Sequence, residues 1–170
     1  VAQRPQRIQI EFVSANPVGP LNVVNARAAA FGDSLANVLS AVGHEVQREY
    51  LVNDAGNQVV LFGESVLNRY LALLGRDYPF PENGYQGEYI AEVAEWILQV
   101  HGNEFEGLRP CLLQDKADDE LRTLLLRFTN IALARMVESQ RQALLDYGVR
   151  FDVWFSDRAL REAGAPGTVI

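Results

Sequence analysis

The first regular pattern along the chain is an alternation of apolar and polar residues over positions 7–13. Ile8, Ile10 and Phe12 are separated by single polar residues, and Val13 extends the apolar run. An alternation of period two predicts a β-strand with one buried face. The next segment, residues 14–20, contains two prolines and a glycine, which end the strand and predict a loop.

A helix is predicted from Asn25 to the glycine at position 43, because the apolar repeat lengthens to three and four residues. The residues expected on its inner face are Phe31, Leu35, Val38, Leu39 and Val42. Residues 45–52 predict a second strand. A strand, a helix and a second strand form a βαβ unit, which places the loop after the first strand at the carboxyl edge of a parallel sheet, where open α/β folds bind ligands.

Helical periodicity dominates the following ninety or so residues, about half of the chain. Helices are predicted from about residue 57 to Leu74, from Gly87 to Val100, and from Asp118 to Tyr147, the last as one helix or a broken pair. Residues 149–154 then predict a third strand. The pattern therefore favours an α/β fold in which a helical segment separates the second strand from the third.

Composition favours one soluble domain of ordinary size, since the chain has 170 residues of which 48% are hydrophobic. The net charge of −7 and the lack of a dense Lys/Arg run argue against direct RNA contact by this segment. No stretch reaches the roughly 18 apolar residues of a membrane span, so a cytoplasmic protein without membrane contact is expected. The single Cys111 cannot form an internal disulfide and is expected to be a filler. Since the first residue is not Met, the chain is expected to be part of a longer protein.

The familiar phosphate-binding and hydrolase motifs are absent, and His44 and His101 lie far apart without cysteine partners. The loop from Ser14 to Asn25 remains. Its asparagines lie before a predicted helix, whose amino terminus is able to receive a phosphate. The same asparagines suit ordinary turns and helix caps. The residues alone leave both interpretations open.

Four blocks in the chain resemble the arginyl-tRNA synthetases, a family of class I aminoacyl-tRNA synthetases. They are residues 11–21 (EFVSANPVGPL), 48–58 (REYLVNDAGNQ), 84–90 (GYQGEYI) and 147–156 (YGVRFDVWFS). Their order and spacing agree with the family and together they extend over nearly the whole chain. The resemblance implies the first half of a Rossmann-like parallel sheet with a helical insertion.

In that family the loop after the first strand carries the sequence His-x-Gly-His, whose histidines contact the ATP phosphates. The corresponding residues here, 22–25, are called the signature segment; both histidines are asparagine and the glycine is valine. The resemblance implies that Asn22 and Asn25 are catalytic and that ATP is bound by Gly19, Pro20, Asn22, Val24 and Asn25. An asparagine amide still donates a hydrogen bond, but charge-assisted bonds are roughly twice as strong. The valine side chain also occupies space that a glycine leaves to the ligand.

The resemblance also implies which residues hold the arginine substrate. They are Glu11, Ser14, Asn16 and Asp157, the last at a position where the family usually has Glu. Fixed carboxylate and carbonyl oxygens are the acceptors that a guanidinium group requires. The alternative for each is capping of a strand end or solvation at the surface. The segment from Asn53 to Gln58 marks the family, and its role stays open between a cap that holds the second strand to the next helix and a ligand contact.

The whole chain, residues 1–170, then corresponds to a partial nucleotide-binding catalytic domain. Residues 7–75 form the first βαβ unit and the following helix, 76–147 a helical insertion, and 148–170 a third strand and a substrate loop. The intact protein is expected to be a monomer that joins L-arginine to its tRNA through an arginyl-adenylate, using ATP with Mg²⁺. No metal is expected in this segment, which alone is expected to be inactive. Two alternatives are a non-catalytic paralogue acting as a binding or regulatory module, and a nucleotide-binding domain with another substrate.

Overall fold

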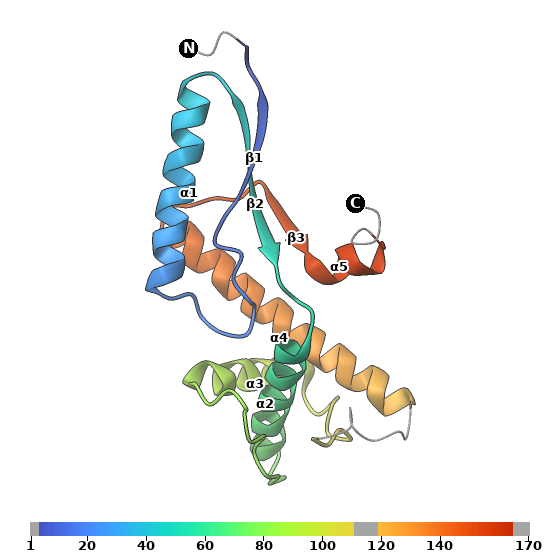
Figure 1. Cartoon of the computed structure of the whole chain (residues 1–170). Helices are drawn as coiled ribbons and strands as arrows, with labels where there is room; N and C mark the ends of the chain where they lie inside the picture. The colour runs from blue at the N-terminus through green and yellow to red at the C-terminus, as the bar shows by residue number, and fades with distance from the viewer. Residues whose placement is uncertain (1–3, 111–118, 165–170) are drawn as a thin grey trace. The chain divides into compact units, whose positions relative to one another are not determined.

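The computed structural model describes residues 4–110 and 119–164. These residues form two compact units, one within Val1–Ala55 and Glu138–Ile170 and the other within Gly56–Val137 (Figure 1). Cys111 and the end of the predicted substrate loop lie outside the described residues. Among those described, no helix combines the length and the apolar character needed to cross a membrane. The domain boundaries expected from the sequence stay a prediction.

The first unit is built on a three-stranded parallel sheet. Strands β1 (Arg7–Glu11), β2 (Glu45–Val52) and β3 (Val153–Ser156) lie in the order β1-β2-β3. Helix α1 (Val23–Ala41) connects β1 to β2 and runs alongside the sheet (Figure 1). The register places Glu11 beside Glu49 and Tyr50 beside Trp154. The predicted α/β fold with a parallel sheet is confirmed.

Small residues form the side of α1 that faces the sheet. Ala29, Gly32 and Ala36 are its buried residues. The larger residues expected inside are exposed or half-buried: Phe31, Leu35, Val38, Leu39 and Val42. The predicted inner face was wrong because the helix approaches the sheet closely at Gly32. A Cβ there would lie 2.2 Å from the ring of Phe12, so a larger side chain has no room.

The third strand begins later than its apolar residues suggest. Gly148, with φ of +88°, ends the preceding helix, and the amide of Val149 still donates to the carbonyl of Leu144 (2.9 Å). Residues 149–152 are therefore a connection, and pairing with β2 begins at Val153. Phe151 lies outside the paired residues, and its ring packs against the ring of Trp154 (5.6 Å between centroids). The predicted strand 149–154 was wrong in its bounds, and a short helix, α5 (Asp157–Glu162), follows it.

The second unit is helical. It contains α2 (Asn57–Leu73), α3 (Glu88–His101) and the larger part of α4 (Asp119–Asp146). The predicted inner faces of α2 and α3 are confirmed by the burial of Val59, Phe62, Val66, Tyr70, Ile90, Val93, Ala94 and Ile97. Leu73, at the end of α2, is the exception. Helix α4 is continuous, which decides against the broken pair.

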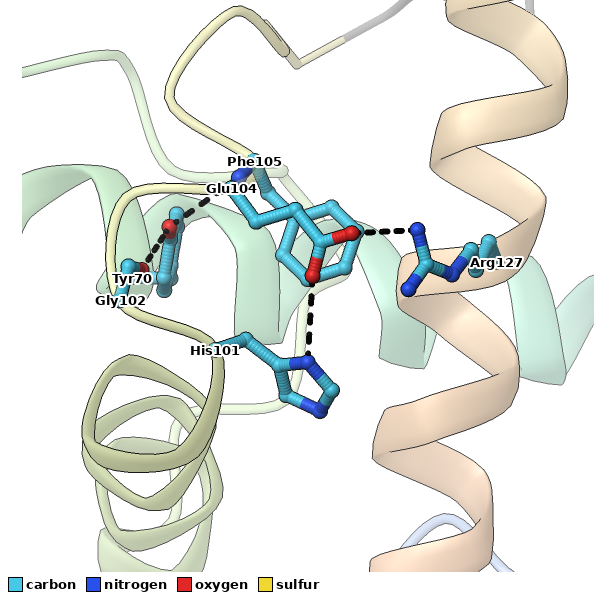
Figure 2. A network of polar contacts seen from close by, with 6 residues as sticks. All are labelled: Tyr70, His101, Gly102, Glu104, Phe105 and Arg127. Atoms are coloured by element: carbon cyan, nitrogen blue, oxygen red, sulfur yellow. Dashed lines mark hydrogen bonds and ion pairs between the residues drawn. The ribbon is translucent and has the colours of Figure 1, made fainter.

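A polar network joins the turn after α3 to α2 and α4 within this unit (Figure 2). The hydroxyl of Tyr70 donates to the carbonyl of Gly102 (2.7 Å). The carboxylate of Glu104 contacts His101 Nδ1 (3.2 Å) and the guanidinium of Arg127. The network therefore fastens the turn to both helices, and it includes none of the residues that the sequence predicts for a site.

Candidate functional site

The β1–α1 loop (residues 12–22) leaves the sheet through two residues in the left-handed region. Val13 has φ of 68° and Ser14 has φ of 43°, a conformation that costs a non-glycine residue of order 1–3 kcal/mol. Hydrogen bonds hold the bend: Leu51 N donates to Ser14 Oγ (3.1 Å) and Ala15 N donates to the hydroxyl of Tyr50 (3.2 Å). Strained backbone that is held by its surroundings is typical of functional loops.

The two asparagines of the signature segment cap helix α1. Asn22 Oδ1 accepts from the amides of Val24 (2.9 Å) and Asn25 (3.2 Å), and Asn25 Oδ1 accepts from the amide of Asn22 (2.9 Å). These bonds use the oxygen of each side-chain amide and leave its Nδ2 group, which carries two donors, outside the cap. They also occupy two of the first amides of the helix, which an anion would otherwise contact. The cap interpretation is confirmed, while phosphate contact stays a prediction.

The other residues predicted to bind ATP lie next to these asparagines. The carbonyl of Gly19 accepts a hydrogen bond from Gln140 Nε2 (2.8 Å), so its main chain is fixed. Pro20 is exposed, and Val24, in the first turn of α1, is 69% exposed. All five predicted ATP-binding residues lie within positions 19–25 of the sequence, before and in the first turn of α1. Their contact with a nucleotide stays a prediction.

The residues predicted to hold arginine are distributed along the carboxyl edge of the sheet. Glu11 ends β1, and Asp157 follows β3 as the first residue of α5. Asn16 Oδ1 accepts from Asn53 Nδ2 (2.7 Å), which joins the β1–α1 loop to the residue after β2. Asp157 pairs with Arg161 one helical turn later (2.9 Å). Since the strands are parallel, these polar groups share one edge, and their contact with arginine stays a prediction.

Asp54 has a role that the sequence left open. Its Oδ1 accepts from the amide of Arg158 (2.9 Å) and its Oδ2 accepts from Ser156 Oγ (2.7 Å). Ser156 in turn caps α5, because its Oγ accepts from Ala159 N (3.1 Å). Asp54 therefore joins the segment after β2 to the start of α5, which carries Asp157. The expected cap between β2 and the next helix was wrong, because the N-cap residue of α2, Gly56, makes no side-chain cap bond and Asp54 bonds to the start of α5 instead. Ligand contact by this segment stays a prediction.

Tyr50 is fully buried, and burial raises the pKa of its phenol to about 12, although its bond with the backbone of Ala15 lowers it in part. A raised pKa in the folded state stabilises the fold below pH 10, and this contribution is lost as the pH rises from about 10 to about 12. We expect Tyr50→Phe to reduce the alkaline loss of unfolding free energy by roughly 2 kcal/mol. Urea unfolding of both proteins below pH 10 and near pH 12 measures the difference. Equal alkaline losses would contradict the expectation.

No group of three or more His, Cys, Asp or Glu side chains within residues 4–110 and 119–164 is arranged to hold a metal ion. Carboxylate and carbonyl oxygens are the ligands that Mg²⁺ takes in proteins, usually together with substrate phosphates. We therefore assign no described residue as a magnesium ligand.

No family model matches the chain. Curated relatives do: it is 46% identical to the arginine–tRNA ligase of Carboxydothermus hydrogenoformans and 44% identical to that of Heliobacterium modesticaldum, in each case over 94% of the chain. The crystal structure of a Campylobacter jejuni protein assigned as an arginyl-tRNA synthetase matches with a TM-score of 0.76 and 31% identity over 96% of the chain. The arginyl-tRNA synthetase of Thermus thermophilus matches in fold, with a TM-score of 0.55.

By sequence and by fold, this chain is of the aminoacyl-tRNA synthetase class. The chain spans only 26–27% of the length of its curated relatives and 33% of the Campylobacter jejuni structure. Within that span it belongs to the arginyl-tRNA synthetase family.

Proposed function

We propose that a protein containing this chain attaches L-arginine to its tRNA in an ATP-dependent reaction. The carboxylate of arginine attacks the α-phosphate of ATP and pyrophosphate leaves. A ribose hydroxyl of the terminal adenosine of the tRNA then attacks the carbonyl of the arginyl-adenylate, and AMP leaves. The observation that carries the proposal is the identity of 41–46% to arginine–tRNA ligases over 94–97% of the chain. Such chemistry depends on positioning and on stabilising developing negative charge.

In this proposal the signature segment meets the phosphates. The Nδ2 groups of Asn22 and Asn25 donate to phosphate oxygens, while the oxygens of the same amides maintain the cap of α1. Gly19, Pro20 and Val24 contact the nucleotide beside them. The neutral amide donors of Asn22 and Asn25 stand where the family has two histidines, whose rings are able to carry positive charge. Loss of one donor to developing negative charge costs a few kcal/mol, so the remaining amide donors are expected to matter.

Arginine is held in this proposal at the carboxyl edge of the sheet. The carboxylates of Glu11 and Asp157 and the amide of Asn16 supply the polar groups for its charged ends. Ser14 Oγ accepts from Leu51 N, which leaves its hydrogen and its second lone pair for a ligand. ATP enters with Mg²⁺ as a substrate. The chain alone is proposed to bind both substrates weakly and to charge no tRNA.

We propose that the intact protein is a cytoplasmic monomer and that sequence outside this chain completes it. The relatives are about three and a half times as long as the chain. We propose that the exposed apolar residues of α1, including Phe31 and Val38, pack against that additional sequence. This proposal follows because an exposed apolar stripe on a helix is typical of a surface that another element covers.

A non-catalytic binding or regulatory module is the second candidate. The observation that favours it is the loss of both charged donors from the signature segment together with the valine at position 24. The third candidate, a nucleotide-binding domain for another substrate, predicts no preference for arginine in a panel of amino acids.

Asn22→Ser separates the ligand role of Asn22 from its cap role, because serine caps helices as well as asparagine but carries no amide group. In the longer protein we expect Asn22→Ser to lower arginine-dependent ATP–pyrophosphate exchange, assayed with tRNA present, by about 100-fold, while unfolding by urea is unchanged. Asn22→Ala is the matched variant. It should lose the same exchange activity and also about 1 kcal/mol of unfolding free energy.

Full exchange activity in Asn22→Ser would reject phosphate contact by this amide. Exchange that depends equally on other amino acids would favour the third candidate. No exchange in the unchanged protein would favour the non-catalytic module.

A further inference from the structure

Gln140 of α4, which is 2% exposed, is one of the buried side chains that hold the β1–α1 loop. Its Nε2 donates to the carbonyl of Asn16 (3.1 Å) and to the carbonyl of Gly19 (2.8 Å). Carbonyl oxygens only accept, so the amide nitrogen must face the loop and the amide oxygen must face away from it. Both donors of the side chain are thus committed to the loop main chain.

The oxygen of the same amide is held by Tyr50 of β2. The hydroxyl of Tyr50 lies 3.0 Å from Gln140 Oε1 and 3.4 Å from the carbonyl of Ala15, and its one hydrogen serves the shorter contact. The hydroxyl oxygen accepts from Ala15 N (3.2 Å). The Tyr50 ring is itself fixed by stacking on Trp154, with 4.1 Å between centroids.

The loop needs such support because of its own composition. Pro17 and Pro20 have no amide hydrogen, so neither residue is able to donate to a neighbouring strand or side chain. The carbonyls of Asn16 and Gly19 lie just before these two prolines in the chain. Gln140 therefore fixes the segment at the points where main-chain donors are missing.

We propose that Gln140, with Tyr50 as its support, is a positioning residue for the substrate-binding loop. By holding two carbonyls between Ser14 and Asn22, the side chain sets where Asn16 and the signature segment present their amide groups. This inference rests on the proposed function, in which the loop binds arginine and ATP. Gln140 itself does not touch the reacting atoms. Its effect on the reaction comes through the loop.

Gln140→Met in the longer protein tests the proposal, since methionine fills a similar volume without hydrogen bonds. Gln142→Met is the matched control, because Gln142 is exposed on the same helix and its side chain donates to Asp146 one turn later (2.7 Å). We expect Gln140→Met to raise the KM for arginine and for ATP by about 10- to 100-fold, because a displaced loop weakens substrate positioning. Gln142→Met should leave both constants unchanged.

Hydrogen exchange on the 170-residue chain supplies a readout that does not depend on activity. We expect the amides of Ala15, Leu51 and the first turn of α1 to exchange faster in Gln140→Met, with the interior of α1 unchanged. Gln140→Asn, which retains the amide on a shorter stem, should restore part of the protection and part of the affinity.

The results separate this inference from the proposed function. If Gln140→Met loosens the loop but the unchanged protein shows no arginine-dependent activity, the proposed function fails and the positioning of the loop stands. If the two methionine variants share the same KM values and the same loop exchange, Gln140 does not position the loop. A loss confined to thermal stability, with KM, kcat and loop exchange unchanged, also overturns the inference.

Discussion

Replacing Gly32 with alanine is expected to lower the free energy of unfolding of the chain by roughly 2 kcal/mol or more. The added Cβ would lie 2.2 to 2.8 Å from three atoms of Phe12, one of them the Cβ of that residue. Phe12 has little room to move, because its ring packs on Phe151 with 4.5 Å between centroids. Alanine gains about 1 kcal/mol in helix propensity over glycine, which offsets only part of the strain.

Urea denaturation compares Gly32→Ala with Gly107→Ala, a position where an added Cβ meets no atom within 4 Å. The control should change stability by less than about 0.5 kcal/mol. In a Phe12→Ala background, where the two ring atoms are gone and the Cβ at 2.8 Å remains, Gly32→Ala should cost less. A Gly32→Ala protein as stable as the parent would show that α1 does not approach the sheet as closely as described.

Asp54→Ala is the second substitution with a large expected effect, a loss of roughly 3 kcal/mol of unfolding free energy. The side chain of Asp54 is 11% exposed, and its carboxylate accepts from Ser156 Oγ and from the amide of Arg158. Removing the carboxylate leaves both donors without this acceptor, and the cap of α5 loses the bond that orients Ser156. Bonds to charged groups contribute about 1.5–3 kcal/mol each, and the two are not additive.

Urea unfolding and hydrogen exchange over residues 153–162 measure this effect. Asp54→Asn keeps an acceptor oxygen and should lose about half as much. Asp146→Ala is the control, because Asp146 is exposed and accepts from Gln142 on its own helix. If Asp54→Ala matches Asp146→Ala in stability and in exchange at α5, Asp54 does not hold the start of that helix.

Local patterns predicted the elements well where side chains alternate clearly between a buried and an exposed face. The bounds of β2 agree with the prediction, and α2 and α3 bury the expected faces. The inner face of α1 was missed because Ala29, Gly32 and Ala36 give almost no hydrophobic signal, although they permit the closest packing. Apolar periodicity therefore indicated a helix correctly and its contact face incorrectly.

The supports of the candidate site could not be predicted because they join residues that are distant in sequence. Gln140 reaches a carbonyl 121 residues earlier, and Asp54 reaches residues just over 100 positions later. No local pattern reports such partners. The cap at Asn22 was among the predicted interpretations because capping depends on residues only three positions apart. The resemblance identified the loop, and the structure identified the side chains that hold it.

Charging of tRNA tests the central claim, that the asparagine form of the signature segment belongs to a working arginyl-tRNA synthetase. The measurement is attachment of arginine to tRNA by the longer protein, beside Asn22→His/Val24→Gly/Asn25→His. The triple variant loses the asparagine cap of α1, at a cost of about 1 kcal/mol in stability. We predict that the parent charges tRNA with arginine and with no other amino acid, in the presence of ATP. A parent that charges no tRNA, beside a triple variant that does, would contradict the claim.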